Sequence, residues 1–250
     1  MKKYCMVMSL IITAVFVVSL ASAQETKDDG ITKMPDGSYR SKDHDESNRP
    51  EDSYLAKFHA MDVVDRLIKR NLDEIYLLRV ITANNSGKGD WEAKYKEIYE
   101  GYKDGLQQYY KRNLVYARDK LQKNQVAIRE LFKIIIADYQ KQCEELLNEC
   151  AGKVLLLHLD VSSRIDPDRF DLVNKNHLRL KVGYGQLDEA QSATIASYYP
   201  GAISHLRMSR TYGIAILEDL AKDENEKKAV HDKYKIQKAD NLNRIYQQQQ

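Results

Sequence analysis

A long stretch without proline is the sequence feature that most constrains the fold of this chain. Residues 51–166 contain no proline, and through the second half of that stretch an apolar side chain recurs every three or four residues, for about sixty residues. As a single helix, such a segment would measure roughly 90 Å at about 1.5 Å per residue, whereas the mean helix of a globular domain has about three turns. The pattern therefore predicts an all-α fold, an elongated and bent bundle of long helices with coiled-coil-like packing.

The first 23 residues follow the order of features in a bacterial secretory signal peptide. Residues 1–3 (MKK) are charged, residues 7–20 form an apolar run, and residues 21–23 (ASA) supply a small-x-small cleavage site. The run is shorter than the roughly 20 residues of a membrane-spanning helix, and Cys5 precedes it, unlike the lipidated cysteine of a lipoprotein. We therefore predict a signal peptide at 1–23 and a periplasmic protein with no membrane anchor after cleavage, in preference to an uncleaved anchor.

The charge balance of the secreted chain argues against two classes of partner. Cleavage after Ala23 would remove Lys2 and Lys3, so the 39 basic and 37 acidic residues of the full chain would become 37 of each. A chain without net charge has no global attraction to nucleic acid or to an anionic membrane. Neither is expected as a partner.

Two cysteines remain after the predicted cleavage. Cys143 and Cys150 are seven residues apart, which places them about 10 Å apart on one face of a continuous helix. A disulfide requires Cα atoms within about 7 Å, so the two cannot pair with each other unless the helix breaks between them. We predict two small buried apolar groups, with an intermolecular disulfide as the alternative.

Composition divides the secreted chain into three parts. Residues 24–50 carry almost no apolar side chain and would bury too little surface to offset the entropy lost on ordering, so they are predicted to form a flexible polar arm. Residues 51–246 carry the helical period and are predicted to form one elongated helical domain. Residues 247–250 are glutamines, predicted to fray as a polar tail.

Turn and capping residues indicate the order of helices in the first half of this domain. A helix over residues 51–83 is followed by a turn at 84–89, and Asp90 is placed to cap the next helix, so the two are predicted to form an antiparallel hairpin. The second helix is predicted to continue to residue 150 with a bend. Its near-heptad spacing is interrupted at four positions: Gly101, Gly105, Asn113 and Asn124.

The second half of the domain is predicted to continue as helices. The apolar run at 153–159 is predicted to be a buried helical turn near a hinge, since a lone strand would have nothing to pair with. Asp166 and Pro167 form an N-cap followed by proline at the first helical position. The helix that they start is predicted to run to Pro200, and two further helices are expected over residues 201–222 and 224–246.

The sequence predicts no cofactor, no metal site and no enzyme. No Glu-x-x-His motif of the di-iron bundles occurs, and His59-Ala60-Met61-Asp62, the nearest pattern, stands alone. The six histidines show no ligand spacing. Gly183-Tyr184-Gly185 lacks the third glycine and the preceding strand of a dinucleotide loop, and no Gly-x-Ser-x-Gly elbow is present.

Tyrosine is unusually frequent and predicts surfaces for protein contact. The chain has 17 tyrosines against 4 phenylalanines, and tyrosine is enriched where protein surfaces meet. The alternative is that a slim bundle uses tyrosine at half-buried positions, and the two explanations coincide for a protein that assembles laterally. The candidate contact residues form one group on the second predicted helix and another near a later turn: Tyr95, Tyr99, Tyr102, Tyr109, Tyr110, Tyr116, Tyr198, Tyr199 and Tyr212.

Three segments within this helical architecture, residues 169–173 (RFDLV), the surroundings of Tyr184, and residues 198–203 (YYPGAI), resemble the flagellar-coiling proteins of Leptospira-type spirochetes, in particular the smaller B-type member. The resemblance covers the mature helical region and rests on overall character, so no functional residue is carried over. It implies a non-catalytic component of the periplasmic flagellar sheath. Such a subunit would contact the filament core and other sheath proteins, with self-association as a further contact, and would promote the curvature needed for motility.

Two other functions are alternatives to a sheath component. A periplasmic chaperone or adaptor would use long helices to bind secreted clients, and exposed apolar grooves with holdase activity would favour it. A helical-repeat binding module is suggested by the helix pair around residues 198–220, but no repeat of fixed period occurs elsewhere.

Overall fold

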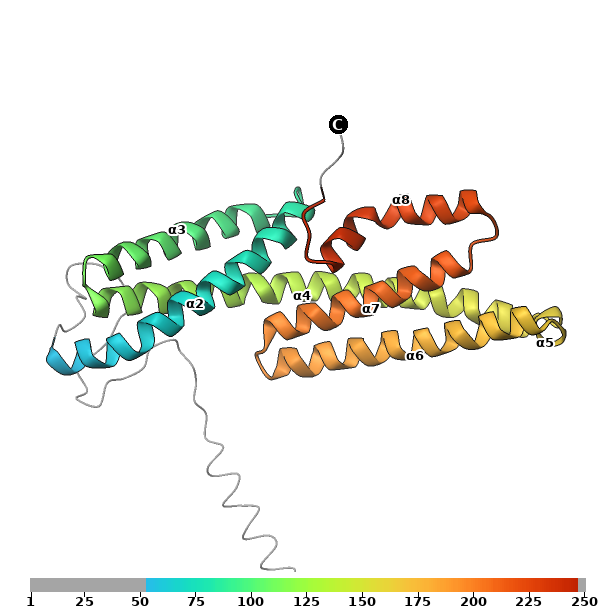
Figure 1. Ribbon diagram of the computed structural model, residues 1–250, viewed down its shortest axis with the longest axis horizontal. Helices are drawn as coiled ribbons and strands as arrows, with labels where there is room; N and C mark the ends of the chain where they lie inside the picture. Colours follow the sequence, from blue (N-terminus) through green and yellow to red (C-terminus); the bar gives the residue numbers. More distant parts are fainter. Residues whose placement is uncertain (1–52, 247–250) are drawn as a thin grey trace, which may run out of the picture. The chain divides into compact units, whose positions relative to one another are not determined.

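The computed structural model describes residues 53–246, apart from the side chains at 163 and 164, and every regular element in this range is a helix. The predicted all-α bundle is confirmed, whereas the predicted signal peptide (1–23), polar arm (24–50) and polar tail (247–250) lie outside the described residues. The elements, in the labels of Figure 1, are α2 (Tyr54–Asn84), α3 (Trp91–Tyr110), α4 (Leu114–Leu159), α5 (Ser162–Ile165), α6 (Pro167–Ile195), α7 (Tyr199–Asp219) and α8 (Glu224–Asn241).

Helices α2 and α3 form the predicted antiparallel hairpin. The start of α3 lies beside the end of α2, where Tyr95 is close to Arg79, and the end of α3 lies beside the start of α2, where Tyr109 is hydrogen-bonded to Asp65. Between the helices the backbone passes through positive φ at two glycines of the predicted turn, 92° at Gly87 and 52° at Gly89, which glycine adopts at little cost.

The prediction of one long, bent second helix is wrong, because the chain reverses between α3 and α4. Arg112 has φ 64°, and the left-handed turn there sends α4 back antiparallel along α3. Gly101 then faces Asn124 and Gly105 faces Leu121, so closely that a Cβ on either glycine would lie 2.8 Å from the opposite side chain. Gly101, Gly105 and Asn124, which are predicted to interrupt one helix, instead lie where two helices approach each other.

Helix α4 has 46 residues, a length of roughly 70 Å, and joins two groups of helices (Figure 1). Its first half packs on α2 and α3, as the hydrogen bond from Asn124 Nδ2 to Asn71 Oδ1 of α2 illustrates, at 2.9 Å. Its second half packs on α6 and α7. There, the side chain of Leu147 fills the space beside Gly183 of α6.

Helices α4 and α7 run parallel. Phe132 stacks on Tyr199, with ring centroids 6.4 Å apart, and further along both helices Cys150 Sγ donates to the carbonyl oxygen of Gly213 at 3.2 Å. The buried residues of α7 on this side alternate in steps of three and four, the spacing of a heptad seam. They are Tyr199, Ala202, Leu206, Ser209, Gly213 and Ile216.

The second half of the bundle confirms one local prediction and corrects another. Asp166 caps α6, its Oδ1 accepting from the backbone N–H of Asp168 at 3.1 Å, and Pro167 occupies the first turn as expected. Residues 153–159 continue α4 as helix, but the expected burial is wrong: Val154 is buried, whereas Leu155 and Leu156 are exposed. These last turns of α4 project beyond the cluster around Val154 and Leu217.

Both cysteines are free and buried, as predicted. Cys143 Sγ donates to the carbonyl oxygen of Leu206 at 3.3 Å, and Cys150 Sγ bonds Gly213 in the same way. Burial raises the pKa of the Cys143 thiol to about 11 and that of Cys150 to about 12. Because the thiolate is the reactive form, both side chains are protected twice, by packing and by protonation.

We therefore expect neither thiol to react in the folded protein. In a chain carrying Cys5→Ser, an aromatic disulfide reagent whose reaction product is coloured should react with almost no thiol at neutral pH while the bundle is folded. After urea unfolds the bundle, the reagent should react with two thiols per chain. Absorbance during the urea titration measures this directly. Rapid labelling of either residue in native buffer would contradict the packing of α4 against α7.

Candidate protein-contact surface

The structure separates the nine candidate tyrosines by exposure. Five of them lie on α3, three lie at or on α7, and Tyr116 lies on α4 rather than on the same helix as the first five. The exposed ones are Tyr99, Tyr110 and Tyr198; the half-buried ones are Tyr95, Tyr109, Tyr116 and Tyr212; the buried ones are Tyr102 and Tyr199.

Two of these tyrosines belong to the core. Tyr102 is 6% exposed and Tyr199 is 7% exposed, so neither offers its ring to a partner. Tyr199 fixes the start of α7 by stacking on Phe132 of α4. For these two residues the structural explanation of the tyrosine content applies, and the contact role stays a prediction for the other seven.

The outer side of α3 carries a small aromatic and cationic surface. The rings of Tyr95 and Tyr99 stack with centroids 6.3 Å apart, and Lys103 Nζ lies 4.5 Å from the Tyr99 ring centroid. Lys103 is also paired with Glu100 at 2.7 Å. The charges on this surface are therefore already paired within the helix, which leaves the tyrosine rings as its distinctive feature.

Tyr198 is an exposed tyrosine whose backbone is held by a turn. It follows Ser197, whose φ is 57°, and its backbone N–H donates to the carbonyl oxygen of Ala193 at 2.8 Å, the 6→1 bond of a Schellman motif. Its ring lies against Gly201, where a Cβ would come within 2.2 Å of ring carbons. The ring is nevertheless 62% exposed. The turn between α6 and α7 thus presents an exposed aromatic side chain whose backbone is held by a hydrogen bond and whose ring lies against Gly201.

A hollow of about 440 Å³ adjoins this tyrosine. Tyr198 and Pro200 form one side, and the other side comes from α2. Two α2 arginines at the hollow are paired along their own helix, Arg66 with Asp62 at 2.6 Å and Arg70 with Glu74 at 3.1 Å. Its remaining lining residues are Lys69 and Asp73. An aromatic wall opposite a charged helix face fits a protein segment with both apolar and charged side chains.

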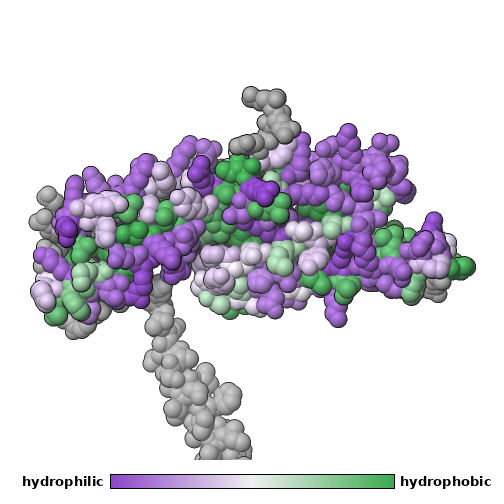
Figure 2. All heavy atoms as spheres, in the orientation of Figure 1, coloured by the Kyte–Doolittle hydropathy of each residue, from purple (hydrophilic) through white to green (hydrophobic). Residues whose placement is uncertain are grey.

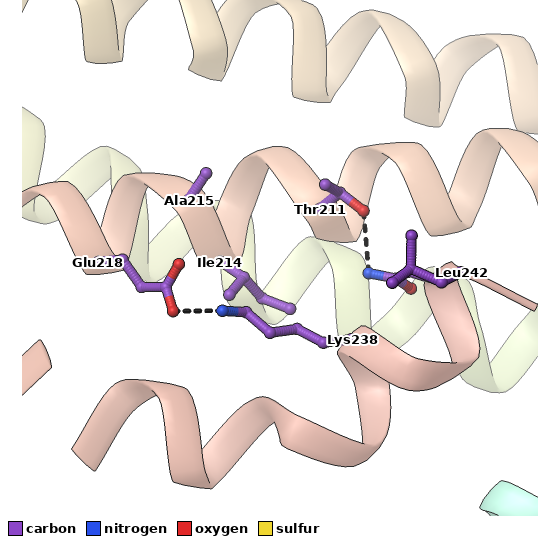
Figure 3. Close-up of a pocket in the computed structure, with 7 residues that line it drawn as sticks. Thr211, Ile214, Ala215, Glu218, Lys238 and Leu242 are labelled. Atoms are coloured by element: carbon purple, nitrogen blue, oxygen red, sulfur yellow. Dashed lines mark hydrogen bonds and ion pairs between the residues drawn. The ribbon is translucent and has the colours of Figure 1, made fainter. Parts of the chain in front are cut away.

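A second hollow, of about 250 Å³, lies between α7 and the end of α8 (Figure 3). Ile214, Ala215 and Leu242 make it largely apolar. Lys238 is hydrogen-bonded to Glu218 across it, and Asn241 Nδ2 donates to Thr211 Oγ1 at 3.0 Å. Its polar groups bond one another, so this hollow is a packing seam between two helices.

One carboxylate in the described part of the chain is buried between two arginines. Asp240 of α8 is 1% exposed, and its Oδ1 lies 2.7 Å from Nη2 of Arg207, while its Oδ2 accepts from Nη2 of Arg210. Tyr139 of α4 donates its hydroxyl to Asp240 Oδ2 at 2.7 Å. The Arg210 guanidinium also lies 4.5 Å from the Tyr139 ring centroid. One carboxylate thereby joins α4, α7 and α8.

The electrostatics of this network favour an ionised carboxylate. Burial alone would raise the pKa of Asp240, but the charges of Arg207 and Arg210 and the hydrogen bonds of Arg207 and Tyr139 outweigh it and lower the pKa below its ordinary value. The arginines have further partners in the chain: Arg207 Nη1 donates to Asn243 Oδ1 at 3.1 Å and Arg210 Nε to Asn241 Oδ1 at 2.8 Å. The network therefore fastens α8 to the bundle.

Sequence reasoning missed this network. Asp240 is the only buried residue of α8. In the sequence it therefore resembles the other charged residues of a solvent-exposed helix. A signal did exist on α7, where Arg207 and Arg210 interrupt an otherwise apolar surface at a spacing of three. Two cations on the buried side of a helix imply an anion elsewhere in the chain.

The described histidines lie on separate helices, and only two of them meet. His158 of α4 and His177 of α6 lie with their ring centroids 5.4 Å apart, a contact that their spacing in the sequence does not predict. Within residues 53–246 no group of three or more His, Cys, Asp or Glu side chains is placed to hold a metal ion. None of the helices in that range combines the length and the apolarity needed to cross a bilayer.

Comparison of the chain with protein-family models, with curated proteins and with solved structures found no match. The surfaces of this chain are therefore the source of functional evidence. Among them, the Tyr198 turn combines exposure, fixed geometry and an adjoining hollow.

Proposed function

We propose that this chain is a non-catalytic structural subunit of a periplasmic flagellar filament sheath, which binds neighbouring proteins laterally and so promotes filament curvature and motility. The secretory signal predicted from residues 1–23 and the resemblance to flagellar-coiling proteins support the location and the assembly. The long helices support a structural role, because they provide extended surfaces for lateral contact.

The observation that carries the proposal is the Tyr198 turn. Tyr198 lies in the segment 198–203, which also carries part of the resemblance. Fixed aromatic side chains bind partners at a low cost in conformational entropy, and tyrosine is one of the residues that dominate binding energy at interfaces. The hollow between Tyr198 and α2 offers room for a side chain of the partner.

The test is made on purified filaments of the host. The gene is deleted, and the filaments are examined for this protein, their thickness and their curvature. We expect wild-type filaments to contain the protein and deletion filaments to be thinner and straighter. Complementation with Tyr198→Ala should leave secretion intact but weaken filament association by at least about tenfold, the loss typical of a central aromatic contact.

Tyr76→Ala is the matched control. Tyr76 is 56% exposed, close to the value for Tyr198, but it lies near Tyr102 on the α3 side of α2. This variant should restore normal filaments. Wild-type filaments that lack the protein and keep their shape after deletion would contradict the sheath role. Concentration-dependent protection of unfolded secreted proteins would then favour the periplasmic chaperone or adaptor.

A further inference from the structure

Exposed apolar side chains gather beside each end of α4, seen as separate apolar areas in Figure 2. At one end, the first turns of α2 and the end of α3 form the Phe58 patch, whose residues are each more than half exposed: Tyr54, Leu55, Phe58, Met61 and Tyr110. At the other end, the last turns of α4, the α5 segment and the start of α6 form the Ile165 patch, exposed to the same degree: Leu155, Leu156, Leu159, Val161, Ile165 and Phe170.

The Phe58 patch is hollowed. Met61, Tyr109, Tyr110 and Leu114 line a hollow of about 370 Å³ together with the charged residues Asp65 and Arg112. Tyr54, Phe58 and Met61 follow at steps of four and three, so they share one face of α2 and extend the apolar surface away from the hollow. This end is therefore shaped to receive an apolar projection.

The Ile165 patch projects. It is held together by Arg169, whose Nη1 donates to Ser162 Oγ at 2.6 Å and lies 3.4 Å from Asp160 Oδ2. This contact ties the start of α6 to the corner that follows α4. Val161 and Ile165 flank that corner and are 69% and 77% exposed. Their side chains are small enough to enter a hollow lined by tyrosine and methionine.

The charges around the two patches are opposite in sign. Residues 54–66 and 108–114 carry four basic side chains (Lys57, Arg66, Lys111, Arg112) and two acidic ones (Asp62, Asp65), a net charge of +2. Among the described side chains of residues 155–171, four are acidic (Asp160, Asp166, Asp168, Asp171) and one is basic (Arg169), a net charge of −3. Two Phe58 patches, or two Ile165 patches, would repel each other, whereas one of each would attract.

We infer that the Ile165 patch of one chain binds the Phe58 patch of a second copy. The patches lie at opposite ends of a helix roughly 70 Å long, so one chain cannot join its own ends. A contact between two different surfaces is heterologous. Such a contact leaves one free patch at each end of the assembly, so further copies can add unless the rotation between successive copies closes a ring. The chain thereby forms head-to-tail rows. This inference does not depend on the proposed function and is tested by a different measurement.

The experiment measures the mass of the secreted full chain by sedimentation velocity between about 1 µM and about 1 mM, the range of weak specific contacts. The average mass of the wild type should rise with concentration beyond that of a dimer, and less so in about 0.5 M salt. Phe58→Glu and Ile165→Glu should each weaken association at least about tenfold. Leu178→Glu, at an equally exposed position on α6, is the matched control and should associate as the wild type does.

Mixing the two variants separates head-to-tail contact from every other arrangement. Phe58→Glu keeps its Ile165 patch and Ile165→Glu keeps its Phe58 patch, so an equal mixture should form dimers and stop there. Circular dichroism confirms that both variants are folded. A wild type that stays monomeric over the whole concentration range overturns the inference. This result is expected if another segment of the chain or another protein covers the patches. Dimers formed by either variant alone overturn it in favour of like-to-like contact.

Discussion

Replacing Asp240 by asparagine is expected to lower the free energy of unfolding by about 3–5 kcal/mol. The substitution keeps the size of the side chain but removes the carboxylate bonded to Arg207 and Arg210, which are 6% and 3% exposed. Two neighbouring guanidinium groups would then remain buried without a counter-ion. Their amide partners on Asn243 and Asn241 remain, but an amide oxygen does not neutralise the charge.

The same carboxylate makes part of the stability depend on pH. The folded pKa of Asp240 is lowered, because the effects of Arg207, Arg210 and Tyr139 outweigh that of burial. A carboxyl with a depressed folded pKa stabilises the fold above its unfolded pKa, about 3.9, and loses that contribution as the pH falls through the folded value. The difference in stability between wild type and Asp240→Asn should therefore be constant above about pH 5 and shrink below about pH 4.

Urea unfolding followed by circular dichroism measures both effects. Asp232→Asn is the matched control, because Asp232 lies on the same helix but is exposed, and such a change usually stays within about 0.5 kcal/mol. Equal losses for the two variants would mean that α8 is not fastened by Asp240. A loss for Asp240→Asn that persists unchanged below pH 3 would place its origin in packing rather than in charge.

The features of the fold that local sequence determines were predictable. The Asp166 cap with Pro167 and the glycine turn after α2 are local signals, and both are found where expected. The reversal at residues 111–113 has no such signal: Arg112 adopts φ 64°, a conformation for which arginine has no preference. The packing of α3 on α4 compensates for the energetic cost of this backbone conformation at Arg112. That packing is a tertiary contact, which the local sequence does not predict.

For the candidate contact surface, the sequence predicted the residue type, tyrosine, but not which tyrosines are exposed. Tyr198 and Tyr199 are neighbours in sequence, yet one is exposed and the other is buried on Phe132. Which of the two faces the core depends on how α7 starts after the turn at Ser197. The Asp240 network has the same origin, since its members come from three helices that only the complete bundle brings together.

The second large effect is expected from Phe132→Ala, which should lower the free energy of unfolding by about 3–5 kcal/mol, the cost of emptying a buried phenylalanine site. Phe132 is fully buried and stacks on Tyr199 with an interplanar angle of 17°. Because Tyr199 follows the turn that presents Tyr198, the cavity should loosen this turn as well as the core.

Phe170→Ala provides the comparison, because Phe170 is 51% exposed on α6 and should cost less than about 1 kcal/mol. Urea unfolding gives both values. The effect of the cavity on the Tyr198 turn is measured separately. Filament association is compared between Phe132→Ala and the wild type at a temperature where the variant is still folded. Folded Phe132→Ala should bind more weakly than the wild type although it changes no exposed residue. Undiminished binding would mean that partners do not depend on a turn held in place by the core.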